Sequence, residues 1–175
     1  MLGTPAAPTL ETPRLILRGW RPEDLAPYAA MLAEPETARF ITRGGEPYSQ
    51  DQVWAEMAWL MGHWQMLGCG LFVVEERATG AFLGRIGCLE PEGWPGFEVA
   101  YTLARHAWGR GYAREGAAAA LRWAREALGR DDVISIIRPA NARSIRVATA
   151  LGATPDGTVE FFGAPAVLYR YPPVG

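Results

Sequence analysis

Residues 105–116 read Arg-His-Ala-Trp-Gly-Arg-Gly-Tyr-Ala-Arg-Glu-Gly, and they form the most informative stretch of this 175-residue chain. An apolar run over 97–103 predicts a strand before them, and residues 112–128 predict a helix after them. Gly109 and Gly111 let the backbone approach a ligand without an intervening Cβ. A helix start also presents unpaired N–H groups and the positive end of its dipole. The stretch therefore predicts an anion site, to which Arg110 and Arg114 add charge.

Two phosphate-binding motifs fail on this stretch. The dinucleotide fingerprint needs a third glycine where Arg114 stands. The Walker A motif needs Lys followed by Ser or Thr after Gly116, where two alanines stand. An ordinary strand–turn–helix with a glycine turn therefore stays open as the alternative to an anion site.

The elements around this stretch predict a mixed α/β (α+β) fold. Pro35 is expected to stop the first helix, and Ser49 is expected to cap the second. Strands are predicted over residues 14–20, 71–75, 81–89, 97–103, 132–138, 158–162 and 166–171. Helices are predicted over residues 22–33, 49–67, 112–128 and 141–151. This order predicts a sandwich around a largely antiparallel sheet. Residues 1–13, with three prolines, are predicted as a flexible lead-in, and residues 14–175 as one domain.

Composition excludes several function classes. The formal net charge is −2, so a strong basic excess that would favour nucleic-acid binding is absent. All 17 basic residues are arginine, which excludes Schiff-base chemistry on a lysine. The two cysteines and two histidines do not have metal-ligand spacing, so no metal is predicted. Residues 57–74 lack charge, but their glycines and helical spacing favour a helix, a turn and a strand over a membrane span. A cytoplasmic protein without a membrane partner is predicted.

Three blocks resemble the Gcn5-related N-acetyltransferase (GNAT) superfamily, in its branch of ribosomal-protein N-terminal acetyltransferases (RimJ/RimL). The first is Trp108-Gly-Arg-Gly-Tyr-Ala113, which is similar to the family's acetyl-CoA signature. The second is Asn141-Ala-Arg-Ser-Ile-Arg-Val-Ala-Thr-Ala-Leu-Gly152, and the third is Arg14-Leu-Ile-Leu-Arg18. The resemblance covers about residues 11–172. It implies a three-layer sandwich with helices on both faces and with the fourth and fifth strands, here residues 97–103 and 132–138, splayed apart.

The resemblance also implies a coenzyme A site. Loop and helix N–H groups would hold the pyrophosphate, the pantetheine arm would lie between the splayed strands, and Asn141 and Ser144 would contact it. The implied cofactor-binding residues are Tyr101, Thr102, Leu103, Trp108, Gly109, Arg110, Gly111, Tyr112, Ala113, Arg114, Asn141 and Ser144. The third helix departs from the family pattern at Gly116, where alanine is usual. This glycine costs about 1 kcal/mol of helix propensity, and two explanations stay open: closer packing under the cofactor, or a chance substitution without a role.

Amine acetylation needs a base for the ammonium proton and an acid for the leaving thiolate, but no metal. Glu98 is the base candidate, directly or through a water, because it is a lone carboxylate among small residues on a strand leading to the loop. The alternative for Glu98 is a solvated or arginine-paired carboxylate. Ser144 is the acid candidate, and its alternative role is to satisfy the start of a helix.

Three hypotheses remain for the function. The first is acetyl transfer from acetyl-CoA to the α-amine of a protein N-terminus. The second is the same chemistry on a small-molecule amine, such as a polyamine, an amino acid analogue or an aminoglycoside. The third is a non-catalytic acyl-CoA-binding protein. The acceptor side is expected to carry acidic and aromatic residues suited to a cationic amine: Trp54, Trp59, Trp64, Trp94, Phe161, Phe162, Glu90, Glu92 and Glu160. The alternative is that most of these tryptophans belong to the core and that the glutamates are solvated surface residues. A homodimer through an edge strand or the last hairpin stays open.

Overall fold

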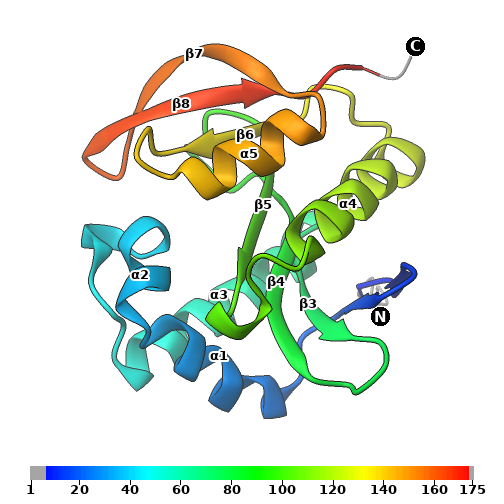
Figure 1. Ribbon diagram of the computed structural model, residues 1–175, viewed down its shortest axis with the longest axis vertical. Helices are drawn as coiled ribbons and strands as arrows, with labels where there is room; N and C mark the ends of the chain where they lie inside the picture. The colour runs from blue at the N-terminus through cyan, green and yellow to red at the C-terminus, as the bar shows by residue number, and fades with distance from the viewer. Residues whose placement is uncertain (1–6, 174–175) are drawn as a thin grey trace.

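The computed structural model describes residues 7–173, which form one eight-stranded sheet with helices on both faces (Figure 1). The strands are β1 (Leu10–Glu11), β2 (Leu15–Arg18), β3 (Leu71–Glu76), β4 (Phe82–Leu89), β5 (Glu98–Leu103), β6 (Ile134–Ile137), β7 (Thr154–Phe161) and β8 (Ala164–Arg170). The helices are α1 (Leu25–Leu32), α2 (Pro35–Ile41), α3 (Gln50–Leu67), α4 (Tyr112–Leu128) and α5 (Ala142–Ala150). Short 3-10 turns are η1 (Pro22–Asp24), η2 (Arg43–Gly45) and η3 (Arg105–Ala107).

The sheet is antiparallel at every junction but one. Its strand order is β1-β2-β3-β4-β5-β6-β8-β7, and only β5 and β6 run parallel. This confirms the predicted fold class, a mixed α/β sandwich around a largely antiparallel sheet.

Each face of the sheet buries its own core, because side chains alternate along a strand. On one face α4 packs against β2, β4 and β5, with Phe72, Ile86 and Val99 fully buried or nearly so. On the other face α1 and α3 form a second core with Leu71 and Leu89. Glu98 lies directly opposite Leu89 in the ladder, so its side chain belongs to the second face.

Helix α4 lies close to the sheet because residue 116 has no side chain. An ideal Cβ at Gly116 would lie 2.5 Å from Cδ1 of Ile86 and 3.5 Å from Cδ1 of Leu15. A real Cβ at the first of these distances would force a shift. The glycine therefore sets how closely α4 packs on β4, which is the packing role that the sequence analysis allowed for it.

Strands β5 and β6 separate after a single paired position, Glu98 with Ile134. Ile134 N–H donates to the Phe97 carbonyl at 2.9 Å, and a regular parallel ladder would next join Ile136 N–H to the Val99 carbonyl. Instead, Ile136 N–H donates to Glu98 Oε1 at 3.2 Å, and the Val99 carbonyl accepts from Ser135 Oγ at 2.6 Å. The side chains of Glu98 and Ser135 thus replace the backbone partners that the two strands lose where they diverge.

The segment between α1 and α3 differs from the prediction. Pro35 was expected only to stop a helix, yet it also starts α2, because the first turn does not need the N–H that proline lacks. Of the predicted lead-in, residues 1–6 lie outside the described residues, and Leu10–Glu11 pair with β2 as β1. Across residues 7–173, no helix combines the length and the apolar character that crossing a membrane requires.

Candidate active site

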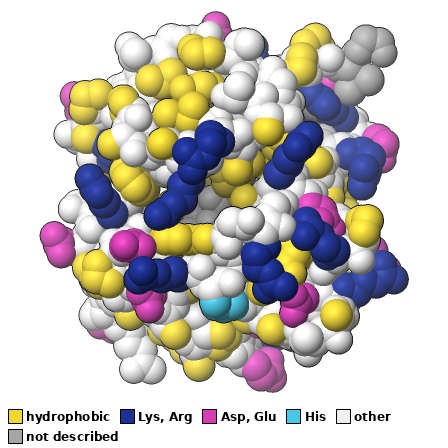
Figure 2. Space-filling view, viewed as in Figure 1, with side chains coloured by type: hydrophobic (Ala, Val, Ile, Leu, Met, Phe, Trp, Pro, Cys, Tyr) yellow, Lys and Arg dark blue, Asp and Glu magenta, His cyan; other side chains and the backbone are white. Residues whose placement is uncertain are grey.

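Two cavities meet at the place where β5 and β6 diverge. One has a volume of about 420 Å³ and the other about 380 Å³. They share Phe40, Ile41, Tyr101, Thr102, Asn141 and Ser144. We call the larger one, which contains Glu98, the acceptor pocket, and the smaller one, at the start of α4, the loop pocket. Figure 2 shows arginine side chains gathered around a hollow in the middle of one face of the molecule.

The loop pocket collects almost all of the residues predicted to bind the cofactor. Those that line it are Tyr101, Thr102, Leu103, Trp108, Gly109, Gly111, Tyr112, Ala113, Arg114, Asn141 and Ser144. Helix α4 begins at its mouth with Gly111 in the left-handed region, at φ 80°, and without a side-chain cap. The first N–H groups of α4 therefore keep their donors for a ligand.

Three arginines line the loop pocket, although Arg110 does not. Arg114 was predicted, whereas Arg143 and Arg146 on α5 were missed, because only the fold brings α5 beside the start of α4. The Arg143 guanidinium lies 4.0 Å from the centre of the Trp108 ring. Arg110 instead donates to Glu76 at 3.2 Å.

Strand β5 offers backbone groups to the gap at alternate residues. Ala104 N–H donates to the Leu83 carbonyl of β4, which fixes the alternation of an antiparallel ladder. The backbone of Thr102 therefore faces β4, and the backbone of Tyr101 and Leu103 faces the gap. The Leu103 carbonyl already accepts from Trp108 Nε1 at 2.7 Å. The N–H and carbonyl of Tyr101 and the N–H of Leu103 therefore remain as the backbone groups of β5 that can bond an extended ligand. Thr102 lines the pocket with its side chain.

Asn141 and Ser144 lie at the start of α5, on the boundary of both cavities. Asn141 Oδ1 accepts from Ser144 N–H at 3.2 Å, so this side chain caps the helix. The Ser144 carbonyl accepts from Tyr101 OH at 2.9 Å, which ties α5 to β5 across the gap. The Asn141 amide NH₂ and the Ser144 hydroxyl remain the groups that these residues can offer to a ligand.

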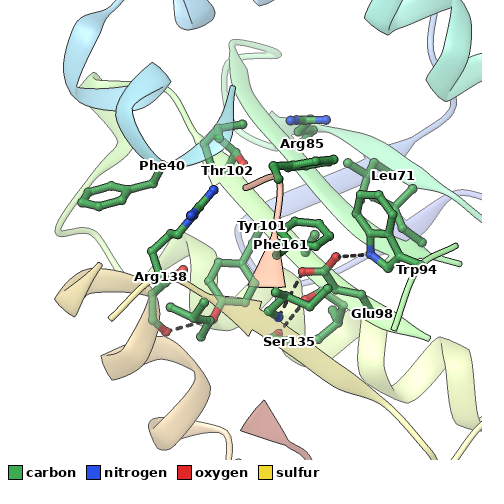
Figure 3. A pocket seen from close by; sticks show the side chains of 18 of the residues that line it. Phe40, Leu71, Arg85, Trp94, Glu98, Tyr101, Thr102, Ser135, Arg138 and Phe161 are labelled. Atoms are coloured by element: carbon green, nitrogen blue, oxygen red, sulfur yellow. Dashed lines mark hydrogen bonds between the residues drawn. The ribbon is translucent and has the colours of Figure 1, made fainter. Parts of the chain in front are cut away.

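Glu98 is the buried carboxylate of the acceptor pocket, only 7% exposed. Its Oε2 accepts from Trp94 Nε1 at 2.7 Å, and its Oε1 accepts from Ile136 N–H at 3.2 Å (Figure 3). Burial raises the pKa of Glu98 from the usual 4.5 to about 7, against the opposing effects of these two donors and of Arg85. Both alternatives considered from sequence, a solvated carboxylate and an arginine-paired one, disagree with this geometry.

The acceptor pocket has an aromatic wall and more arginine than the sequence suggested. Of the residues expected there, Trp59, Glu92, Trp94, Phe161 and Phe162 line it. Trp64 is in the core, Trp54 is 62% exposed, and Glu90 pairs with Arg130 at 2.7 Å. Glu160 is exposed and lines neither cavity. Arg43, Arg85 and Arg138, with Glu56, also line the pocket and were missed, because they come from four separate elements or loops.

Comparison with known proteins identifies the family to which this chain belongs. The model of the acetyltransferase (GNAT) domain matches residues 14–154. The chain belongs to the GNAT acetyltransferase family. It is 29% identical to the protein YkkB of Bacillus subtilis (strain 168) over 163 residues, which is 92% of this chain and 94% of YkkB.

Solved structures agree with membership of the GNAT family. An acetyltransferase from Agrobacterium tumefaciens str. C58 has a TM-score of 0.84 and 31% identity, with 95% of each chain covered. RimL, a ribosomal L7/L12 alpha-N-protein acetyltransferase solved with coenzyme A, has a TM-score of 0.77 and 13% identity. That match covers 93% of this chain and 96% of RimL, and it shows a shared fold.

Proposed function

We propose that this GNAT protein transfers the acetyl group of acetyl-CoA to a primary amine, with Glu98 as the general base. The observation that carries the proposal is the position of Glu98. It is a buried carboxylate in the wall of a pocket that can hold an acceptor, and that pocket adjoins a second one suited to an anionic cofactor.

The loop pocket fits coenzyme A by its donor set. The uncapped start of α4 and the arginines Arg114, Arg143 and Arg146 suit the phosphates, and the free backbone of Tyr101 suits the amide-containing arm. The fold is shared with RimL, which was solved with coenzyme A. Acetyl-CoA would supply the activated acetyl thioester at the junction of the two pockets.

The reaction moves one acetyl group and two protons. The ammonium form of the acceptor loses a proton to Glu98, directly or through a water, and the amine nitrogen bonds to the thioester carbonyl carbon. The carbon–sulfur bond then breaks, the thiolate takes a proton from Ser144 or water, and that donor regains a proton from the nitrogen, which loses its second proton as the amide forms. A base with a pKa of about 7 matches an α-amine, whose pKa is near 7.8, better than a lysine-type amine near 10.4. This match favours an α-amine, in a protein N-terminus or a small molecule.

The test is release of free thiol from acetyl-CoA over a panel of short peptides and small amines. Glu98→Gln is expected to lower kcat by about 10²- to 10⁴-fold, the usual contribution of a general base. Coenzyme A affinity, measured by calorimetric titration, is expected to stay within threefold. Glu126→Gln, an exposed glutamate of α4 outside both pockets, is the matched control. A fully active Glu98→Gln would overturn the base assignment. A wild-type protein that binds acetyl-CoA but acetylates no amine of the panel would overturn the proposed activity and favour the non-catalytic acyl-CoA-binding protein.

A further inference from the structure

Arg85 is a buried arginine of the acceptor pocket whose donors are mostly unused. It is 6% exposed, and its only ion-pair contact among the described residues joins Nη1 to Glu56 Oε1 at 3.1 Å. Arg85 Nε and Glu56 Oε2 are both buried without a hydrogen-bond partner. A structural arginine–carboxylate pair of this kind is usually bidentate and fully bonded. The pair in this pocket satisfies only one side of each group.

The position of Arg85 places it within reach of a molecule that touches Glu98. Arg85 faces Thr102 in the β4–β5 ladder, and Glu98 faces Leu89, so Arg85 and Glu98 lie on one face of the sheet. Four residues along a strand separate their levels by about 13 Å, which two long side chains can bridge in large part. Between these two levels lies the pair Gly87 and Ala100, and the small residue Ala100 lines the pocket. Figure 3 shows Arg85 and Glu98 lining one pocket.

The charges of the pocket wall favour an anionic group in addition to the amine. Arg43, Arg85 and Arg138 line it, together with Glu56 and the exposed Glu92. With Glu98 ionised as the base, three arginines face three carboxylates, so a bound ammonium group leaves one positive charge in excess. In Figure 3, Arg138 extends from the end of β6 toward Thr102 and Phe40. Such a wall disfavours a polycation and leaves donors for an oxyanion.

We infer that the acceptor is a primary amine that carries a carboxylate, with its amine at Glu98 and its carboxylate at Arg85. This inference rests on the acetyltransferase function proposed above and narrows its substrate class. It disfavours the polyamine and aminoglycoside hypotheses. A cavity of about 420 Å³ is within the range of small-ligand sites. The carboxylate can belong to a free amino acid or to an acidic side chain near a peptide's N-terminus, since both present the same group to Arg85.

The test measures binding and turnover with matched acids and amides. Glycine, 4-aminobutyrate and 6-aminohexanoate, each against its own amide, are titrated into protein saturated with coenzyme A, with spermidine as the polycation. The peptides Ala-Glu-Ala and Ala-Gln-Ala, both C-terminally amidated, distinguish the two sources of the carboxylate. At least one acid is expected to bind tenfold or more tightly than its amide, and the same acid is expected to have the lower KM.

Variants show whether Arg85 causes this preference. The double variant Glu56→Gln/Arg85→Met removes the cation without leaving a charged buried carboxylate. It is expected to abolish the preference for the acid, while amide binding and coenzyme A affinity change less than threefold. Arg122→Met, an exposed arginine of α4, is the control. Equal binding of acids and amides, a preference that survives in the double variant, or no binding of any acid would each overturn the inference. Absence of thiol release with every acceptor would instead overturn the proposed function, because the binding comparison does not depend on turnover.

Discussion

The raised pKa of Glu98 makes a quantitative prediction about stability. A carboxyl group whose pKa is higher in the folded chain stabilises the fold while it is protonated, and this contribution is lost as pH rises from the unfolded pKa to the folded one. For Glu98 that window runs from about 4.5 to about 7. At about 1.4 kcal/mol for each pH unit, the free energy of unfolding should fall by about 3 kcal/mol across the window because of this group alone.

The variant Glu98→Gln isolates this effect because glutamine does not titrate. Its amide can accept from only one of the two donors, Trp94 Nε1 and Ile136 N–H, so the variant carries a constant cost of about 1–3 kcal/mol. That offset does not depend on pH, whereas the wild-type contribution does. The difference in unfolding free energy, wild type minus variant, should therefore decrease by about 3 kcal/mol between pH 4.5 and pH 7.

Urea unfolding at half-unit intervals from pH 4.5 to pH 8 measures this difference directly. Other carboxylates titrate in both proteins, so their contributions cancel in the comparison. The curve should be flat above pH 7.5. A difference that stays constant from pH 4.5 to pH 8 would refute the burial argument for Glu98.

Three further perturbations have defined outcomes. Trp94→Phe removes a donor to Glu98, so the rising limb of kcat against pH should move to higher pH, and an unmoved limb would contradict the base assignment. Gly116→Ala should destabilise the fold by up to about 2 kcal/mol in urea unfolding, because about 1 kcal/mol of helix propensity offsets part of an overpacking cost of about 1–3 kcal/mol. Gly62→Ala on α3, where a Cβ meets nothing within 4 Å, should stabilise the fold by up to about 1 kcal/mol. Asn141→Ala removes a helix cap and should cost about 1 kcal/mol in the same assay, together with weaker coenzyme A binding in calorimetry. A stabilising Gly116→Ala, or an Asn141→Ala without loss of affinity, would count against the respective assignment.

The fold followed from sequence wherever local signals agreed with the tertiary structure. Ser49 is the residue before α3, where its N–H donates to the Gln52 side chain at 2.9 Å, and α4 spans the predicted residues 112–128. The signals misled at prolines, because the same residue ends one helix and begins the next at Pro35. At Pro155, a turn-like sequence lies inside β7, where a shift in register accommodates it. These outcomes depend on neighbours that a local pattern does not contain.

The candidate site divides in the same way. The loop, α4 and Asn141 are contiguous blocks, so a pattern could locate them. Arg85, Glu56 and Arg138 could not be found, because a lone charge is ordinary in a sequence until the fold brings it into the wall of a pocket. Glu98 lay between these cases: its strand position was suggestive, but only the structure shows its burial and its two donors.

Glu98 has a structural role that constrains how the site can change. Its Oε1 accepts from Ile136 N–H, which in a regular ladder would donate to the Val99 carbonyl. The Val99 carbonyl accepts instead from Ser135 Oγ. The divergence of β5 and β6 opens the space for two pockets, and it exposes backbone groups that must find other partners. Glu98, the proposed base, therefore also supplies the hydrogen-bond acceptor that the backbone of β6 lacks where β5 and β6 diverge. A substitution that keeps an acceptor oxygen preserves this hydrogen bond, whereas alanine would leave a buried N–H without a partner, so loss of activity in Glu98→Ala would report on both roles at once.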